Sequence, residues 1–323
     1  MNRSDYAYSV AYVRAIENRL LTKSDIENLI LAKSADDVLR IISDKGYGSG
    51  ITGENFDKAL NDAFTKCFEE ITDIAPEDSN LEILLYKNDF HNLKVVLKGV
   101  QIGVRDYENY IINPSTVDYE TLIKGIASAN FDDFPQMLKS VAQKAYDILG
   151  KTGDSQLSDT IIDKEAMDYT LLEAKKTKNE FLIGLVKLTN TLTDIKIAAR
   201  CALTQKDAEF INMAISQDSS INRDELLKTS LGGIASLNDF LSSSGYTEAA
   251  KALKKSVADY EKYADNTIND YMKNSKYITL GIEPLLAYIY SKQNEIQAIR
   301  IILSAKQNGI SEDKIRMRLR SFV

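Results

Sequence analysis

Side chains able to do acid–base or metal chemistry are scarce in this chain. Among its 323 residues there is one histidine, His91, and there are two cysteines, Cys67 and Cys201. A histidine-rich zinc or di-iron centre needs several such ligands, and a disulfide framework needs more cysteines. A Ser-His-Asp triad would have to use His91, and no G-x-S-x-G turn is present to carry its serine.

One glycine pattern resembles a dinucleotide-binding loop. Gly48-Ser-Gly50-Ile-Thr-Gly53 matches G-x-G-x-x-G literally. That loop works only between a strand and a helix, where backbone N–H groups meet the pyrophosphate. The residues before it, 36–45, have the apolar spacing of a helix. We therefore expect a loop between helices and no nucleotide site.

Paired acids are the remaining candidates for metal chemistry. They occur at Asp36-Asp37, Glu69-Glu70 and Asp132-Asp133. A magnesium-dependent helical enzyme would present D-D-x-x-D on one helix face, and only the glutamate pair has an acid at that spacing, Asp73. Solvated helix positions explain these acids better. Cys67 and Cys201 stand among apolar residues and are expected to be buried and inert. We predict no catalytic, cofactor or metal residue.

The elements that would position such residues are predicted to be helices throughout. Apolar residues recur every three or four positions, no segment alternates convincingly, and four prolines and fifteen glycines leave few breaks. The fold class is therefore predicted to be all-α. The clearest helical segments are 10–21, 26–42, 56–71, 81–100, 119–126, 166–172, 181–203, 225–231, 249–272 and 285–303.

Helix starts recur along the chain. Boxes of the form Ser-x-x-acid stand at Ser24 and Ser115, Asn222 begins a similar one, and Ser311 precedes two acids. An apolar residue or pair follows each of them. These openings suggest the beginnings of internal repeats.

A second landmark supports triplication. Asp89-Phe-His-Asn-Leu-Lys94 resembles Thr191-Leu-Thr-Asp-Ile-Lys196 and Glu295-Ile-Gln-Ala-Ile-Arg300, and the basic residues recur about every 100 positions. The middle copy has Thr191 where the others have an acid. We predict three helical domains: 1–113 with a leader helix, 114–219, and 220–323 with a basic C-terminal helix. His91 aligns with Thr193 and Gln297, so a catalytic role for it is not expected.

Charge and hydropathy exclude further classes of function. The formal net charge is −7, so bulk attraction to nucleic acid or anionic lipid is not expected. The N-terminus has no signal-peptide pattern, and no run of about 18 apolar residues could span a bilayer. Basic residues gather at the end, at Lys314, Arg316, Arg318 and Arg320. They either complement a helix dipole or contact an acidic partner.

Three segments carry a family resemblance that extends over the whole chain. The most specific is Gly281-Ile-Glu-Pro-Leu-Leu-Ala-Tyr-Ile-Tyr-Ser-Lys-Gln-Asn-Glu-Ile-Gln-Ala-Ile-Arg300. It resembles the C-terminal signature of the C subunits of bacterial and archaeal V/A-type ATPases, whose eukaryotic counterpart is the d subunit. The residues 6–21, Tyr-Ala-Tyr-Ser-Val-Ala-Tyr-Val-Arg-Ala-Ile-Glu-Asn-Arg-Leu-Leu, are similar to that family's opening helix. Asp89–Lys94 resembles the family's recurrent D-x-x-N-L-K element. The middle repeat departs from that element, because it lacks both the Asn and the acid, for which Thr191 stands. In the third repeat Ala298 replaces the usual Asn.

This resemblance implies a protein of three similar helical domains in a pseudo-threefold funnel. It implies a non-catalytic rotor subunit that binds the central shaft subunits and the membrane proteolipid ring and transmits torque for ATP-coupled transport of H⁺ or Na⁺. The chain would be peripheral, at the cytoplasmic face, with membrane contact only through the ring. Polar residues of the repeats are candidates to line the funnel: Lys94, Lys196, Arg200, Glu295 and Arg300. The alternative is that they form ion pairs within each domain.

Two other functions stay open at this point. The first is a helical-repeat scaffold of another complex. The second is a helical enzyme with a carboxylate metal site, which would require tight binding of Mg²⁺ or Mn²⁺.

Overall fold

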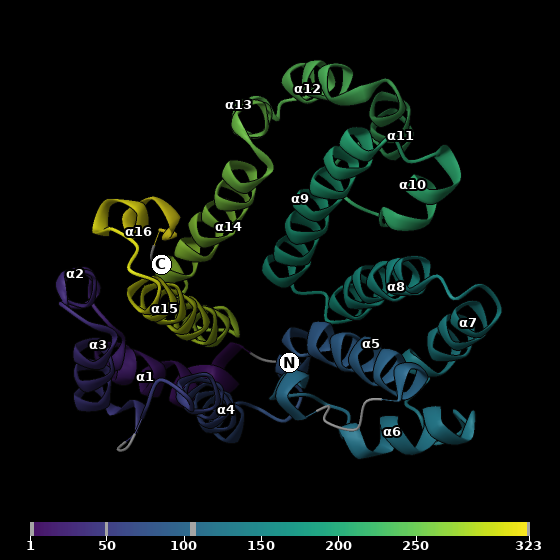
Figure 1. The fold of residues 1–323 in the computed structure, drawn as a ribbon. Helices are drawn as coiled ribbons and strands as arrows, with labels where there is room; N and C mark the ends of the chain where they lie inside the picture. Colours follow the sequence, from purple (N-terminus) through teal and green to yellow (C-terminus); the bar gives the residue numbers. More distant parts are fainter. Residues whose placement is uncertain (1–2, 49–50, 104–107, 322–323) are drawn as a thin grey trace. The chain divides into compact units, whose positions relative to one another are not determined.

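The computed structural model describes residues 3–48, 51–103 and 108–321, and all regular structure in these ranges is helical. This confirms the predicted all-α class (Figure 1). The α-helices are α1 (Ala7–Ile16), α2 (Lys23–Leu31), α3 (Ala35–Ile42), α4 (Phe56–Ile74), α5 (Tyr86–Ile102), α6 (Tyr119–Ser128), α7 (Gln136–Thr152), α8 (Ser155–Lys176), α9 (Glu180–Thr204), α10 (Ala208–Ala214), α11 (Arg223–Leu231), α12 (Gly233–Ser243), α13 (Thr247–Lys255), α14 (Val257–Lys273), α15 (Glu283–Gln307) and α16 (Glu312–Arg318). Shorter turns are 3₁₀ at Arg3–Tyr6, Glu17–Arg19, Leu81–Leu84, Glu108–Tyr110 and Asn274–Tyr277, and π-helical at Ser43–Tyr47.

Helix ends follow local capping more closely than apolar period. The stretch 26–42, predicted as one helix, is broken between α2 and α3 because the Ser34 hydroxyl accepts the Asp37 N–H and begins a new helix. Ser256 receives the Asp259 N–H in the same way and separates α13 from α14. A serine can therefore end one helix and begin the next while the apolar residues on both sides keep their spacing of three or four.

The predicted capping boxes had mixed outcomes. Asn222 begins α11 as expected, since its side chain accepts the Glu225 N–H. The box at Ser24 was wrong, because Thr22 and Asp25 form the real capping box of α2. The box at Ser115 was also wrong, since its hydroxyl donates to the Val117 carbonyl instead of capping a helix. Ser311 stands at the start of α16 with two acids in its first turn.

The chain divides into two compact units. One contains residues 1–81 and 265–323, and the other contains residues 82–264. Helix α14 begins in the second and ends in the first. The predicted division into three domains, with boundaries after residues 113 and 219, stays a prediction.

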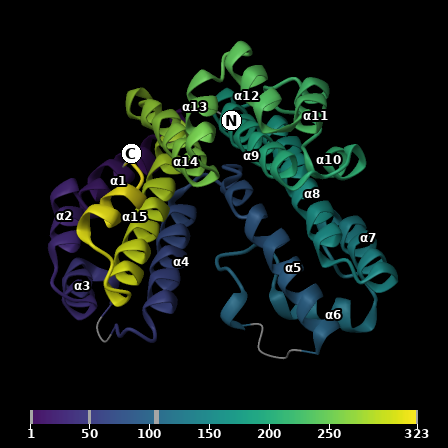
Figure 2. The same cartoon turned by 45° about the horizontal axis from the view of Figure 1, so that its top comes forward.

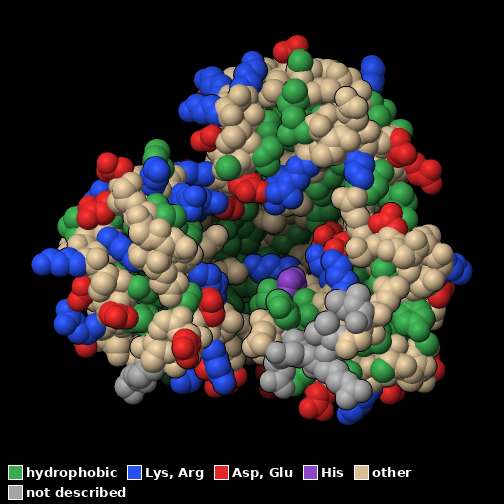
Figure 3. Space-filling view, viewed as in Figure 1, with side chains coloured by type: hydrophobic (Ala, Val, Ile, Leu, Met, Phe, Trp, Pro, Cys, Tyr) green, Lys and Arg blue, Asp and Glu red, His purple; other side chains and the backbone are tan. Residues whose placement is uncertain are grey.

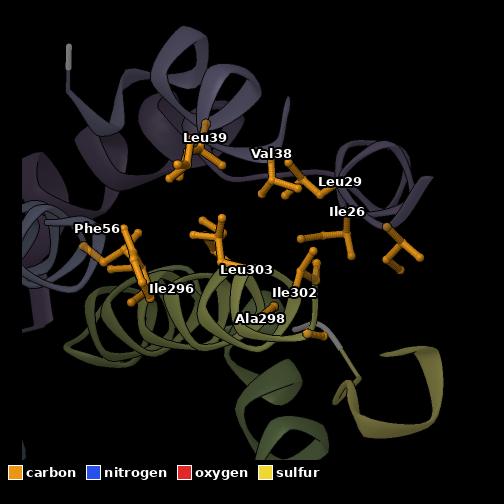
Figure 4. Close-up of a cluster of buried hydrophobic side chains, with 14 of the residues drawn as sticks. Ile26, Leu29, Val38, Leu39, Phe56, Ile296, Ala298, Ile302 and Leu303 are labelled. Atoms are coloured by element: carbon orange, nitrogen blue, oxygen red, sulfur yellow. The ribbon is translucent and has the colours of Figure 1, made fainter. Parts of the chain in front are cut away.

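In the first unit, α15 is the central helix. It packs against α1, α2, α3, α4 and α16, and Figure 2 shows it lying alongside α4. The core that results joins opposite ends of the sequence, because Ile26, Leu29 and Val38 meet Ile302 and Leu303 (Figure 4). The start of the chain is therefore part of the core that buries α15.

In the second unit, two central helices are joined by α8. Helix α5 packs against α6, α7 and α8, whereas α9 packs against α8, α10, α11 and α12. The core around α9 also receives the fully buried Tyr260 of α14, whose hydroxyl donates to the Leu192 carbonyl at 2.8 Å. Both central helices contain one of the repeated landmarks.

Two helical glycines allow a matched test of packing in this unit. A Cβ on Gly125 of α6 would lie 2.2 Å from the Phe134 ring and 2.9 Å from the Asn130 carbonyl oxygen, whereas one on Gly150 of α7 would meet nothing within 4 Å. We expect Gly125→Ala to lower the free energy of unfolding by about 1–3 kcal/mol through overpacking. Gly150→Ala should raise it by up to about 1 kcal/mol. Urea denaturation of both variants checks the signs, and equal effects would contradict this packing.

The surface carries charges of both signs. Figure 3 shows Lys and Arg side chains interleaved with Asp and Glu on the face in view. Many pairs lie within one helix, such as Lys251 with Glu248 and Lys273 with Asp270, each at 2.7 Å. Within the described ranges, no helix is long and apolar enough to cross a membrane.

Candidate functional site

The first landmark contains a buried carboxylate, Asp89 of α5. Its Oδ1 accepts the backbone N–H groups of Thr116 and Val117 at 2.8 and 3.0 Å, and its Oδ2 accepts the Thr116 hydroxyl at 2.7 Å. The side chain is fully buried, and burial raises the pKa of Asp89 although these hydrogen bonds act to lower it. Asp89 thus holds the segment that leads into α6 against α5.

The second landmark has an equivalent in Asp194 of α9. Asp194 is 1 % exposed and accepts the backbone N–H of Ser216 at 2.8 Å and its hydroxyl at 2.6 Å. Burial raises its pKa as well. Thr191, one turn earlier, accepts the Ser220 N–H at 2.8 Å. Together they fix the segment that leads into α11.

The third landmark centres on Glu295 of α15, which is 2 % exposed. Its Oε2 accepts the backbone N–H of Leu21, just before α2, and its Oε1 accepts the Tyr47 hydroxyl. Lys292 donates to Glu295 Oε1 at 2.7 Å and to the Tyr47 hydroxyl oxygen at 2.9 Å, with its ammonium 4.1 Å from the Tyr47 ring centroid. Burial, and then the Glu295 charge, raise the pKa of Tyr47.

The three carboxylates share one chemical task. Each is buried on a long central helix, and each accepts a backbone N–H from the segment that precedes a shorter helix. Because a backbone N–H without a partner in a protein interior is costly, each acid specifies where that segment docks. These hydrogen-bond partners of all three acids lie in the same unit as the acid. The three carboxylates therefore position neighbouring segments against the central helices.

Three of the other predicted interface residues form ion pairs within their own unit. Lys94 pairs with Asp163 at 2.5 Å, Arg200 with Glu261 at 2.8 Å, and Arg300 with Asp57 at 2.7 Å. Arg300 also donates to the Asn61 side-chain oxygen at 3.1 Å. Lys196, half-buried on α9, has no ion pair with another described residue.

Sequence reasoning missed Asp194. The alignment of the three landmarks places Thr191 opposite the acids of the other two, which predicts that the middle landmark lacks its acid. In the structure Asp194, three residues later, has the corresponding role. The available signal was the place of Asp194 on the apolar stripe of a predicted helix. Its neighbours on that stripe, Asn190 and Ala198, are buried in the structure as well. A charged residue in such a place needs a partner, and here the partner is Ser216, far along the chain.

The residues considered for chemistry have structural surroundings. Cys67 and Cys201 are buried and free of disulfides, as predicted, and burial raises both thiol pKa values, that of Cys67 to about 12. The His91 Nε2 lies 3.2 Å from the Tyr110 carbonyl oxygen, and burial lowers its pKa. Glu70 accepts a hydrogen bond from Arg19 at 3.0 Å.

The glycine pattern also lacks the context of a nucleotide loop. Its members Ser49 and Gly50 lie outside the described residues. Helix α3 and a π-helical turn precede it, as expected, and α4 follows it. In the part of the chain that the structure describes, no three His, Cys, Asp or Glu side chains are grouped so as to hold a metal ion.

Comparison with known proteins gives the same family along nearly the whole chain. The sequence model of the ATP synthase (C/AC39) subunit family matches residues 9–318. The V-type sodium ATPase C subunit of Enterococcus hirae is 25 % identical, covering 95 % of this chain and 96 % of its own. The A-type ATP synthase C subunit of Methanosarcina mazei is 23 % identical over 98 % of this chain and 93 % of its own. The chain therefore belongs to the ATP synthase (C/AC39) subunit family.

Proposed function

We propose that this chain is the central-stalk subunit of a V/A-type ATPase that joins the shaft subunits to the proteolipid ring. It passes torque between them and catalyses no reaction itself. The observation that carries the proposal is the family match over residues 9–318, together with relatives of nearly the same length that are named as the C subunits of such enzymes. The chain would work at the cytoplasmic face and reach the membrane only through the ring.

The packing of the helices supports a mechanical role. A part that transmits torque must deform little, and close-packed helices have low compressibility. Helices α9 and α15 each contain 25 residues, roughly 37 Å of helix. Asp89, Asp194 and Glu295 tie neighbouring segments to such helices. Load applied at a loop would pass directly into a long element.

The repeated buried acids also support a threefold design. We propose that the domains 1–113, 114–219 and 220–323 each present one central helix, α5, α9 or α15, to a common axis. A shaft inserted along that axis would meet equivalent positions of all three. Lys94, Lys196, Arg200 and Arg300 are the candidates for that contact, and Glu295 braces its helix from within.

The decisive experiment measures coupling. Membrane vesicles from cells that lack this gene should show ATP-driven ion uptake near background, because the shaft would turn without the ring. Adding back the purified chain should restore uptake. Normal uptake in vesicles without the chain would overturn the proposal. Affinity purification from membranes should also recover the other ATPase subunits.

A charge swap separates shaft contact from internal pairing. Arg300→Glu alone would break the ion pair with Asp57 and place two acids together. The double variant Arg300→Glu with Asp57→Arg restores the pair with its signs exchanged. If Arg300 contacts an acidic shaft surface, we expect the double variant to bind purified shaft subunits about tenfold more weakly than the wild type.

Lys196→Glu provides the comparison, since it disrupts no ion pair with a described residue. It should weaken shaft binding to a similar extent without changing the unfolding midpoint. Binding of the swapped pair at wild-type affinity, measured by calorimetry at physiological salt, would assign Arg300 to internal pairing instead.

A further inference from the structure

The strongest unexplained feature of the first unit is a groove between α15 and the end of α16. Its volume is about 330 Å³, and it is lined by Arg300, Ile301, Ser304, Ala305, Arg318 and Arg320. Three arginines thus surround a floor that is partly apolar. This volume is near the lower end of protein ligand sites, roughly 300–1,000 Å³, and suits one or two side chains of a segment laid across it.

Two of the arginines are held in place from within the chain. Arg300 Nε donates to Asp57 at 2.7 Å, and Arg320 Nε donates to Asp265 at 2.7 Å. Arg320 also donates through Nη1 to the Arg318 carbonyl oxygen at 2.6 Å. The remaining guanidinium nitrogens, Arg300 Nη1 and Arg320 Nη2, have no hydrogen bond to a described residue. These side chains are therefore pre-organised and still have donors to offer.

Arg318 differs from them because it has no ion pair with any described residue, and it is exposed. The backbone beside it is fixed. Leu319 is buried in the core of this unit, and the Ser321 N–H donates to the Asn266 side chain at 2.8 Å. The Arg318 side chain therefore extends from a rigid wall of the groove with its whole fork of donors available.

We propose that this groove binds an acidic segment of another subunit of the assembly, one in which carboxylates flank an apolar side chain. The carboxylate would pair with the Arg318 fork, and the apolar residue would contact Ile301 and Ala305. The two neighbouring carboxylates, Asp57 and Asp265, leave the three arginines with an excess of one positive charge. That excess suits a single carboxylate better than a phosphate dianion or an anionic lipid surface.

This proposal rests on membership of the chain in a working ATPase, and one experiment tests the two separately. The photoreactive residue p-benzoylphenylalanine replaces Ser304, which is exposed in the groove, and the chain is purified from cells with its complex. Irradiation and mass spectrometry identify the attached segment. A parallel sample carries the label at Ser243, exposed in the other unit.

We expect the photoreactive residue at position 304 to attach to a segment rich in Asp and Glu that the label at position 243 does not reach. Recovery of the complex with no attachment at Ser304, or attachment to lipid or to a segment without acids, overturns the groove proposal alone. Failure of ATPase subunits to co-purify overturns the proposed function, and the groove proposal with it.

Charge reversal supplies an independent readout. Arg318→Glu should weaken binding to the purified subunit that is identified by attachment at position 304. The loss should be about tenfold or more, because a charge-assisted contact becomes a repulsion. Lys314→Glu makes the same change of charge on the same helix but outside the groove, and should have less than a twofold effect. Arg318→Glu places an acid at the end of α16 and should lower the unfolding midpoint slightly, but both variants should be fully folded at the temperature of the binding assay. Equal effects of the two on binding would overturn the proposal.

Discussion

Replacing Glu295 with alanine is expected to lower the free energy of unfolding by about 3–5 kcal/mol. The variant would leave the Lys292 ammonium, the Tyr47 hydroxyl and the Leu21 N–H without their shared acceptor. The Lys292 side chain is only 15 % exposed, so water cannot replace the carboxylate fully. Urea denaturation followed by circular dichroism measures the change.

A double-mutant cycle identifies the pair as the cause. Glu295→Gln keeps an acceptor for Leu21 but removes the charge, and Lys292→Met removes the cation. Each alone leaves a buried group poorly matched, whereas the double variant leaves neither charge. The two effects should therefore add to more than the double variant loses, with a coupling of about 0.5–3 kcal/mol. Simple additivity would show that Glu295 and Lys292 act independently.

Replacing Asp89 with alanine is expected to lower the free energy of unfolding by about 2–4 kcal/mol, since the buried Val117 N–H loses its acceptor and a void remains. Asp89→Asn should cost much less. Its Oδ1 can accept the same two N–H groups, and the Thr116 hydroxyl can turn to accept from the new amide. A large cost for both variants would contradict this geometry.

The raised pKa of Asp89 predicts that the cost of Asp89→Asn depends on pH. Because burial raises the pKa of Asp89, the folded chain holds this proton more tightly than the unfolded chain does. The stability contributed by the group is therefore greatest below its ordinary pKa and falls as pH rises through the raised value. Asparagine has no such proton. The cost of Asp89→Asn should shrink as pH rises above the ordinary Asp pKa of about 4, and Asp194→Asn should behave in the same way.

Local features were predictable to the extent that nearby residues decide them. The apolar period predicted 181–203 as a helix, and α9 extends one residue further at each end. Asn222 was identified as a cap because its partner, Glu225, is three residues away. The break at Ser34 was missed because the apolar stripe continues across it, and the hydrogen bond of a cap adds nothing to periodicity.

Long-range partners could not be predicted in this way. The sequence marked Glu295 as part of a landmark, but nothing near it points to Leu21 or Tyr47, which precede it by more than two hundred residues. Asp194 was overlooked because its place in the helix differs from that of Asp89 by about one turn. Burial of the side chain, not its alignment, decides which acid binds the neighbouring segment.

The burial of the two thiols has a practical consequence for attaching a label to this protein. With its pKa raised to about 12, the Cys67 thiol is almost entirely protonated at pH 7, and burial raises the pKa of Cys201 as well. A maleimide dye should therefore leave the native protein almost unlabelled within minutes. A single cysteine introduced at an exposed serine such as Ser243 would then carry the only reporter, without removal of either native thiol.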